Sequence, residues 1–110
     1  MQSAPLLVHT IQPTADVTAC RFISPTGAVP AAGANTLGIV RSDTLAGDDA
    51  PVTVIGTEII EISEALAAGV LVETTNDGRA AALSAGVAVA RLLQAGTVAG
   101  QKVEALLLPN

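Results

Sequence analysis

The sequence predicts an all-β domain, a small β-barrel or barrel-like sandwich with an extended N-terminal arm and little helix. Three observations carry this prediction. The apolar segments are short and rich in valine, isoleucine and threonine, which fit a pleated surface. Glycines and prolines interrupt these segments at short intervals. The pair Asp77-Gly78 supplies the positive φ angles of a tight hairpin turn.

Residues 1–20 predict an extended arm or an edge strand, and residues 21–110 predict a single β domain. Apolar and polar side chains alternate through Leu7, His9 and Ile11, and two prolines flank this stretch. Proline cannot donate to a β-ladder, so a segment of this kind lies at a sheet edge or along another surface.

The strand pattern becomes clearer between residues 38 and 63. Its β-branched residues sample two faces after a polar turn, and Gly56 in their midst predicts a bulge or a bend that changes which face is buried. The following stretch, 62–69, is compatible with one helical turn.

The C-terminal part contains the clearest hairpin signal. Segments 70–75 and 79–83 flank the turn and are expected to pair as antiparallel strands. Residues 79–95 leave helix and strand open, because alanine and leucine favour helix whereas alternating valines favour strand. A closing strand places Val103 and Leu107 on one face.

An internal comparison indicates a repeat. LGIVRSDTLAGDDAPVTVI aligns with ARLLQAGTVAGQKVEALLL at an offset of 53 residues, which matches Thr44 with Thr97 and Gly47 with Gly100. The apolar positions before and after the turn align as well. Two copies of a strand, a polar Ala-Gly turn and a second strand fit a closed small barrel or sandwich.

The composition makes the core adequate but lean. The chain has 110 residues, of which 50% are hydrophobic, 14% charged and 1% aromatic. This length fits one domain, and so apolar a composition excludes most disordered classes. A core built from alanine and valine removes less surface from water than one built from aromatic residues. We therefore expect support from a partner or from self-association.

The residues that could carry chemistry form no catalytic, cofactor or metal site, so we expect no enzyme and no cofactor. His9 lies in the expected arm rather than beside a nucleophile and an acid. Cys20, the single cysteine, is interpreted as a small buried apolar residue. Glu58, Glu61 and Glu64 are interpreted as solvated acids. No glycine-rich nucleotide loop is present.

The charge distribution argues against nucleic acid and membrane as partners. The net charge is −5, and the five basic residues are spread singly along the chain. Binding of phosphates or of an anionic membrane surface needs clustered lysine and arginine. No basic residue precedes position 21, so the start of a secretory signal is absent and we expect synthesis in the cytoplasm.

Three pieces of the chain, taken in order, resemble a known family. They are LGIVRSDTLAGDDAPVTVIG, LAAGVLVETTNDGRAAAL and LLQAGTVAGQKVEALLLP. Their order of Ala-Gly turns, short valine strands and a D-G-R-A hairpin resembles the head-decoration or capsid cement proteins of tailed bacteriophages. The resemblance covers about two thirds of the chain, and the N-terminal third departs from the pattern.

The resemblance implies a structural, non-enzymatic role in the virion. Such a protein, made in the bacterial host cytoplasm, would bind the outer surface of the phage head and clamp neighbouring major capsid subunits. Its partners would be the major capsid protein and further copies of itself, as a trimer or dimer. The candidate residues for these contacts are Leu6, Leu7, Val8, His9, Ile11, Arg21 and Arg41.

Two other classes of function remain open at this stage. One is a small β-barrel that binds a small ligand or serves as an accessory subunit of an enzyme, with a cavity lined by valine and alanine. The other is a component of a phage tail or baseplate, which would share the composition but assemble as rings or tubes.

Overall fold

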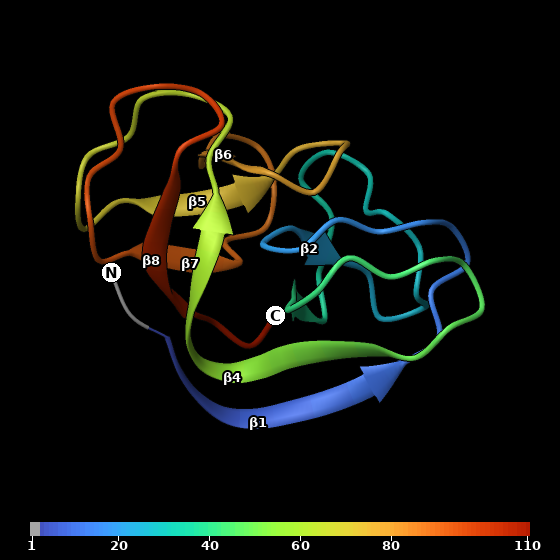
Figure 1. Cartoon of the computed structure of the whole chain (residues 1–110). Coiled ribbons are helices and arrows are strands. Elements are labelled where there is room, and N and C mark those ends of the chain that lie inside the picture. The colour runs from blue at the N-terminus through green and yellow to red at the C-terminus, as the bar shows by residue number, and fades with distance from the viewer. Residues whose placement is uncertain (1–2) are drawn as a thin grey trace.

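The structure, a computed structural model that describes residues 3–110, is an all-β domain in which one sheet curls into a barrel-like shape (Figure 1). No helix occurs in the described range. Its strands are β1 (Ala4–Ile11), β2 (Phe22–Ile23), β3 (Gly38–Val40), β4 (Ala50–Glu61), β5 (Leu71–Thr74), β6 (Ala80–Ala82), β7 (Ala90–Leu92) and β8 (Lys102–Leu107). The predicted fold class is therefore confirmed.

Strand β4 organises the sheet. Its first part lies between β1 and β3, and its last part pairs with β8, so one strand belongs to two regions of the sheet (Figure 1). The bend between these parts lies at Gly56, whose φ is +113°. The register with β1 shifts on both sides of Leu7, opposite this bend. The predicted bulge at Gly56 is thus confirmed.

Local expectations in the second part of the chain are mostly confirmed. Strands β5 and β6 pair as an antiparallel hairpin, and Gly78 in their turn has a φ of +83°. Of the two states left open for residues 79–95, the structure shows strands, β6 and β7. The helical turn expected at residues 62–69 is wrong, because Ile62 and Leu66 form isolated β-bridges there.

The internal repeat is real and extends well beyond the aligned turn. Before the turn, however, the sequence alignment is wrong by one residue, because Val40 corresponds to Leu92 rather than to Leu93. Strands β2 and β3 pair Phe22 with Ile39, just as β5 and β7 pair Leu71 with Arg91. The backbone hydrogen bonds of the connecting turns also recur. The matching bonds, written for the first and then the second copy, are Cys20–Val40 and Gly69–Leu92, Val40–Arg21 and Leu92–Val70, and Gly47–Pro13 and Gly100–Ile62.

Strand β1 has its counterpart in the last part of β4. Ile11 pairs with Ala50 as Ile60 pairs with Val103, and His9 pairs with Val52 as Glu58 pairs with Ala105. The chain is therefore a tandem duplication: a first half, residues 4–54, and a second half, residues 55–110, with β4 running through the boundary. The last part of β4 serves as the opening strand of the second copy.

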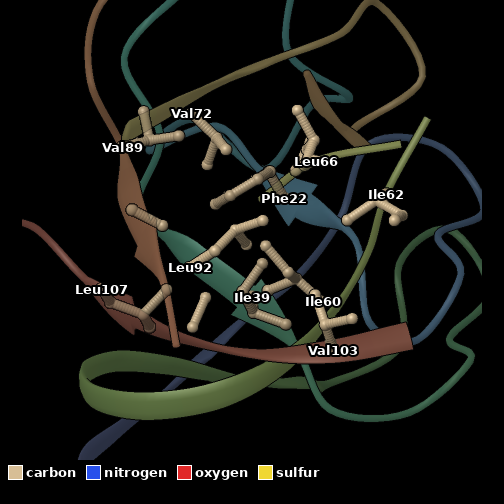
Figure 2. Packing of buried hydrophobic residues seen from close by; sticks show 13 residues of the cluster. Phe22, Ile39, Ile60, Ile62, Leu66, Val72, Val89, Leu92, Val103 and Leu107 are labelled. Carbon is tan, nitrogen blue, oxygen red and sulfur yellow. The ribbon is translucent and has the colours of Figure 1, made fainter. Parts of the chain in front are cut away.

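The core follows the duplication but is unequal. A smaller cluster fills the first half, with Ile23, Val40 and Val52 at its centre. A larger cluster fills the second half and also takes in Phe22 and Ile39 from the first half, which point into it (Figure 2). Both side chains are almost fully buried. These two residues join the halves into one hydrophobic unit.

Cys20 and Gly69 occupy matching corners and offer a test of the duplication. Cys20 has a φ of +67°, a left-handed conformation that costs a residue with a Cβ about 1–2 kcal/mol, and Gly69 has a φ of +87°. Gly69→Ala should lower the free energy of unfolding by about 1 kcal/mol, because the new methyl meets nothing within 4 Å and only the backbone is strained.

The reverse exchange serves as its control. Cys20→Gly should leave the free energy of unfolding within about 0.5 kcal/mol of wild type, because relief of strain offsets the greater freedom of the unfolded chain. Urea denaturation measures both variants. A loss in Cys20→Gly as large as that in Gly69→Ala would contradict the matching of the two corners.

A candidate docking edge on the first strand

Strand β1 is exposed to an unusual degree for a strand with this sequence. Leu6, Leu7 and Val8 are 81%, 48% and 42% exposed, and His9 and Thr10 are exposed as well. Of the five candidate residues on this strand, Ile11 is half-buried and packs against the core of the first half. Ile11 therefore anchors the strand to the core, whereas the side chains of residues 6–10 are exposed to solvent.

Of the two forms that the sequence left open for this segment, arm or edge strand, the structure shows the edge strand. Residues 4–11 pair along the first part of β4, and the Ala4 amide also donates to the Thr57 hydroxyl at 2.9 Å. Farther along, Val17 and Thr44 form a β-bridge. The segment is thus an integral strand of the sheet, with one side facing outward.

The pairing of β4 determines which backbone amides and carbonyls of β1 have no partner in the sheet. The Arg41 amide donates to the Pro51 carbonyl at 2.9 Å, so Pro51 points toward the β3 side. Because backbone groups alternate in direction along a strand, Val52 points to the other side and bonds with His9. Val8 and Thr10 therefore direct their amides and carbonyls away from the sheet.

This open stretch of edge is short and well defined. No other backbone bond within residues 3–110 reaches the amide or carbonyl of Val8 or Thr10. Beyond them the loop at Gly27 covers the edge. It packs so closely on the chain just after β1 that a Cβ added to Gly27 would lie 2.8 Å from the Gln12 carbonyl oxygen. Residues 4–11 carry no formal charge at neutral pH. Exposed edges are normally protected by charged side chains, so this edge suits the addition of another strand.

Arg21 and Arg41, the two remaining candidates, are not gathered at this edge. Each pairs with a carboxylate on the last part of β4: Arg21 with Glu61 at 3.3 Å and Arg41 with Glu58 at 3.6 Å. Arg79 approaches Glu61 as well, at 3.8 Å. The first two ion pairs link the two halves of the chain to each other, whereas Arg79 and Glu61 both belong to the second half.

Glu58 corrects one interpretation drawn from the sequence. The sequence indicates a solvated acid, but Glu58 is 6% exposed and accepts a hydrogen bond of 2.8 Å from the buried Thr53 hydroxyl. Its two partners, Thr53 and Arg41, lie 5 and 17 positions away along the chain and come into contact with Glu58 only in the folded sheet. No local pattern could have revealed this burial.

Three groups have shifted pKa values, and all serve local structure. The Ser84 amide donates to Glu73 at 2.6 Å and lowers the pKa of that carboxyl. A hydrogen bond from the Thr75 hydroxyl lowers the pKa of Asp77 in the hairpin turn. Burial raises the pKa of the Cys20 thiol, which keeps it protonated at neutral pH.

A second exposed surface has no signal in the sequence. It is an open pocket of about 260 Å³ near the C-terminus, lined by apolar side chains that include Pro25, Leu37, Val54 and Ile55. The lining residues come from four separate segments, so no sequence window contains the pocket. Its apolar lining, without convergent charged groups, suits a protein contact better than a reaction.

Neither a metal-binding cluster nor a membrane-spanning helix occurs in the described part of the chain. Within residues 3–110, no group of three or more histidine, cysteine or acidic side chains is placed to hold a metal ion. The same residues contain no helix long and apolar enough to cross a membrane.

Comparisons with known proteins show the fold. No family model matches the chain, and no curated protein matches it. A solved structure, the head fiber gp8.5 N base of bacteriophage phi29, is similar with a TM-score of 0.76 and 15% sequence identity. The similarity covers 93% of this chain and 93% of that chain. The similarity of fold therefore extends over the whole barrel-like domain rather than over a fragment of it.

Proposed function

We propose that this protein is a structural component of a bacteriophage virion that attaches to the outside of the head. The observation that carries the proposal is the fold shared, over nearly the full length of both chains, with the head fiber gp8.5 N base of phage phi29. The resemblance of three sequence pieces to capsid decoration proteins supports the same location independently of the fold.

We further propose that the protein acts there as a cement, which binds the major capsid protein and stabilises contacts between its subunits. The surface of the domain suits binding rather than catalysis, since Leu6, the most exposed large apolar residue in the described range, lies with Leu7 and Val8 on an open sheet edge. Assembly as a trimer or dimer would multiply modest contacts into strong attachment to a repetitive shell.

The edge of β1 is the proposed point of attachment. A strand of the capsid protein would bond to the free groups of Val8 and Thr10, while Leu6 and Val8 would contact its side chains. Removing β1 altogether is a poor test, because its loss would strip the β-ladder from the first part of β4.

Thr10→Pro is the sharper variant. It removes one outward amide and leaves the β1–β4 bonds in place, because proline is tolerated at the free side of an edge strand. We expect binding to undecorated heads to fall at least about tenfold, the effect of losing roughly 1.4 kcal/mol. Co-sedimentation with heads measures the binding, and circular dichroism monitors the fold.

Two controls accompany this variant. Thr10→Ala keeps the amide and should bind as wild type does. His9→Pro removes an amide that faces Val52 and should destabilise the domain itself. Wild-type binding by folded Thr10→Pro would refute the role of the edge, and failure of the wild-type protein to pellet with heads would refute the proposed function.

A further inference from the structure

The two halves of the chain are in contact through one particular face of the first half. Phe22, Ile39 and Thr53 lie side by side on β2, β3 and β4, and they are 2%, 0% and 0% exposed. Phe22 and Ile39 insert into the hydrophobic cluster of the second half (Figure 2). The duplication therefore contains an interface in which one copy of the fold buries this face against the next copy.

Within residues 3–110, the same face of the second half has no such cover. The positions that match Phe22, Ile39 and Thr53 are Leu71, Arg91 and Leu106, which pair across β5, β7 and β8. Leu106 is 39% exposed, although its neighbours Ala105 and Leu107 point inward and are buried. Leu93, just beyond β7, is 45% exposed. We call Leu71, Arg91, Leu93 and Leu106 the outer face.

The surface of the second half that receives Phe22 and Ile39 also has a counterpart in the first half, and this counterpart is partly exposed. Val89 and Leu107 line the cluster that receives Phe22 and Ile39, and they are 1% and 7% exposed. The matching residues of the first half, Leu37 and Val54, are only partly buried and line the apolar pocket of about 260 Å³. The chain thus presents an uncovered inserting face at one end and an uncovered receiving site at the other.

We propose that the outer face of one molecule packs against the pocket of a second copy of this chain. The contact would be head to tail and would repeat the contact that the two halves already make. A head-to-tail contact joins two different surfaces, so successive copies close into a ring when the rotation between them permits. The proposal specifies the interface of the oligomer proposed above and rests on that oligomer.

Charge supports a second copy as the occupant. Within the chain, ion pairs cross the interface between the halves, from Arg41 to Glu58 and from Arg21 to Glu61. At the free ends the matching residues are Leu93 with His9 and Val70 with Gln12, none of which is an acidic residue, a lysine or an arginine. A repeated contact therefore buries no charge at these four positions. The outer face does contain one charged group, the guanidinium of Arg91, which donates to the Gly69 carbonyl at 2.8 Å.

The test uses the mass of the full chain in solution, measured by analytical ultracentrifugation. Wild type should sediment at a multiple of the 10.9 kDa chain mass. Leu106→Glu, in the outer face, and Pro25→Glu, in the pocket, should each sediment as monomers with unchanged circular dichroism. Val98→Glu replaces another exposed apolar residue, 61% exposed and outside both surfaces, and should remain oligomeric.

Mixing the two variants makes the test specific. Leu106→Glu keeps an intact pocket and Pro25→Glu keeps an intact outer face, so an equimolar mixture should form heterodimers and nothing larger. A monomeric wild type, an oligomeric Leu106→Glu variant or a mixture that stays monomeric would each overturn the proposal. An oligomer that behaves as expected but ignores phage heads would leave it standing and refute only the proposed function.

Discussion

Gly38→Ala should lower the free energy of unfolding more than alanine at any other described glycine with an ordinary, negative-φ backbone conformation. A Cβ at this position would lie 2.0 Å from the Thr53 carbonyl oxygen and 2.9 Å from its carbon. Both atoms are backbone and cannot rotate away. We expect Gly38→Ala to reduce the free energy of unfolding by about 3 kcal/mol or more, a large part of the stability of a small domain.

The comparison with Gly47 isolates the cause. Gly47 has a φ of +84°, and a Cβ added there would meet nothing within 4 Å, so Gly47→Ala should lose only about 1 kcal/mol from backbone strain. Urea denaturation of the two variants against wild type provides the measurement. Equal losses would show that β3 can move away from β4 and that the tight contact is not needed.

Truncating Ile39 to alanine should be the most damaging change to the core. Ile39 is fully buried and packs in the larger cluster although it comes from the first half. Leu or Ile to Ala changes at such sites cost about 2–5 kcal/mol, because the lost contacts leave a cavity. Ile39 is among the largest fully buried side chains, and many of the other core residues are the smaller alanine and valine, so we expect Ile39→Ala to lie in the upper part of that range.

The same variant shows whether the halves fold together. Thermal and urea unfolding of Ile39→Ala should each show a single transition shifted to lower stability if the two halves are one cooperative unit. Leu45→Ala, at a residue that is 64% exposed, serves as the control and should change stability by less than about 0.5 kcal/mol. A loss below about 1 kcal/mol in Ile39→Ala would contradict the joining role assigned to this residue.

Local signals predicted much of the fold from the sequence. The Asp77-Gly78 turn identified the β5–β6 hairpin, and Gly56 identified the bend of β4, because each glycine stands where the backbone requires a positive φ. The repeat was visible only between residues 37–55 and 90–108. Around β1 it was hidden, since residues 4–23 and 53–72 share only Ile11/Ile60 and Ala19/Ala68 as identical pairs.

Relations across long distances in the chain could not be predicted in this way. The spacing of the acids suggested that Glu58 is solvated, whereas its burial depends on Thr53, from another part of β4, and on Arg41, from the turn after β3. The sequence left arm and edge strand open for the candidate residues of β1, and which of their amides face outward depends on Pro51. That dependence exists only in the folded sheet.

The passage of β4 from one half into the other has a consequence for how this domain can be cut or extended. Most repeat proteins can be divided or lengthened at a loop between units, but here the boundary falls inside a continuous strand, at the bend of Gly56. A fragment ending in any loop would carry a strand without its partner. Added units would have to be spliced within β4, and a reporter inserted for imaging belongs instead at the open corners of Gly47 or Gly100.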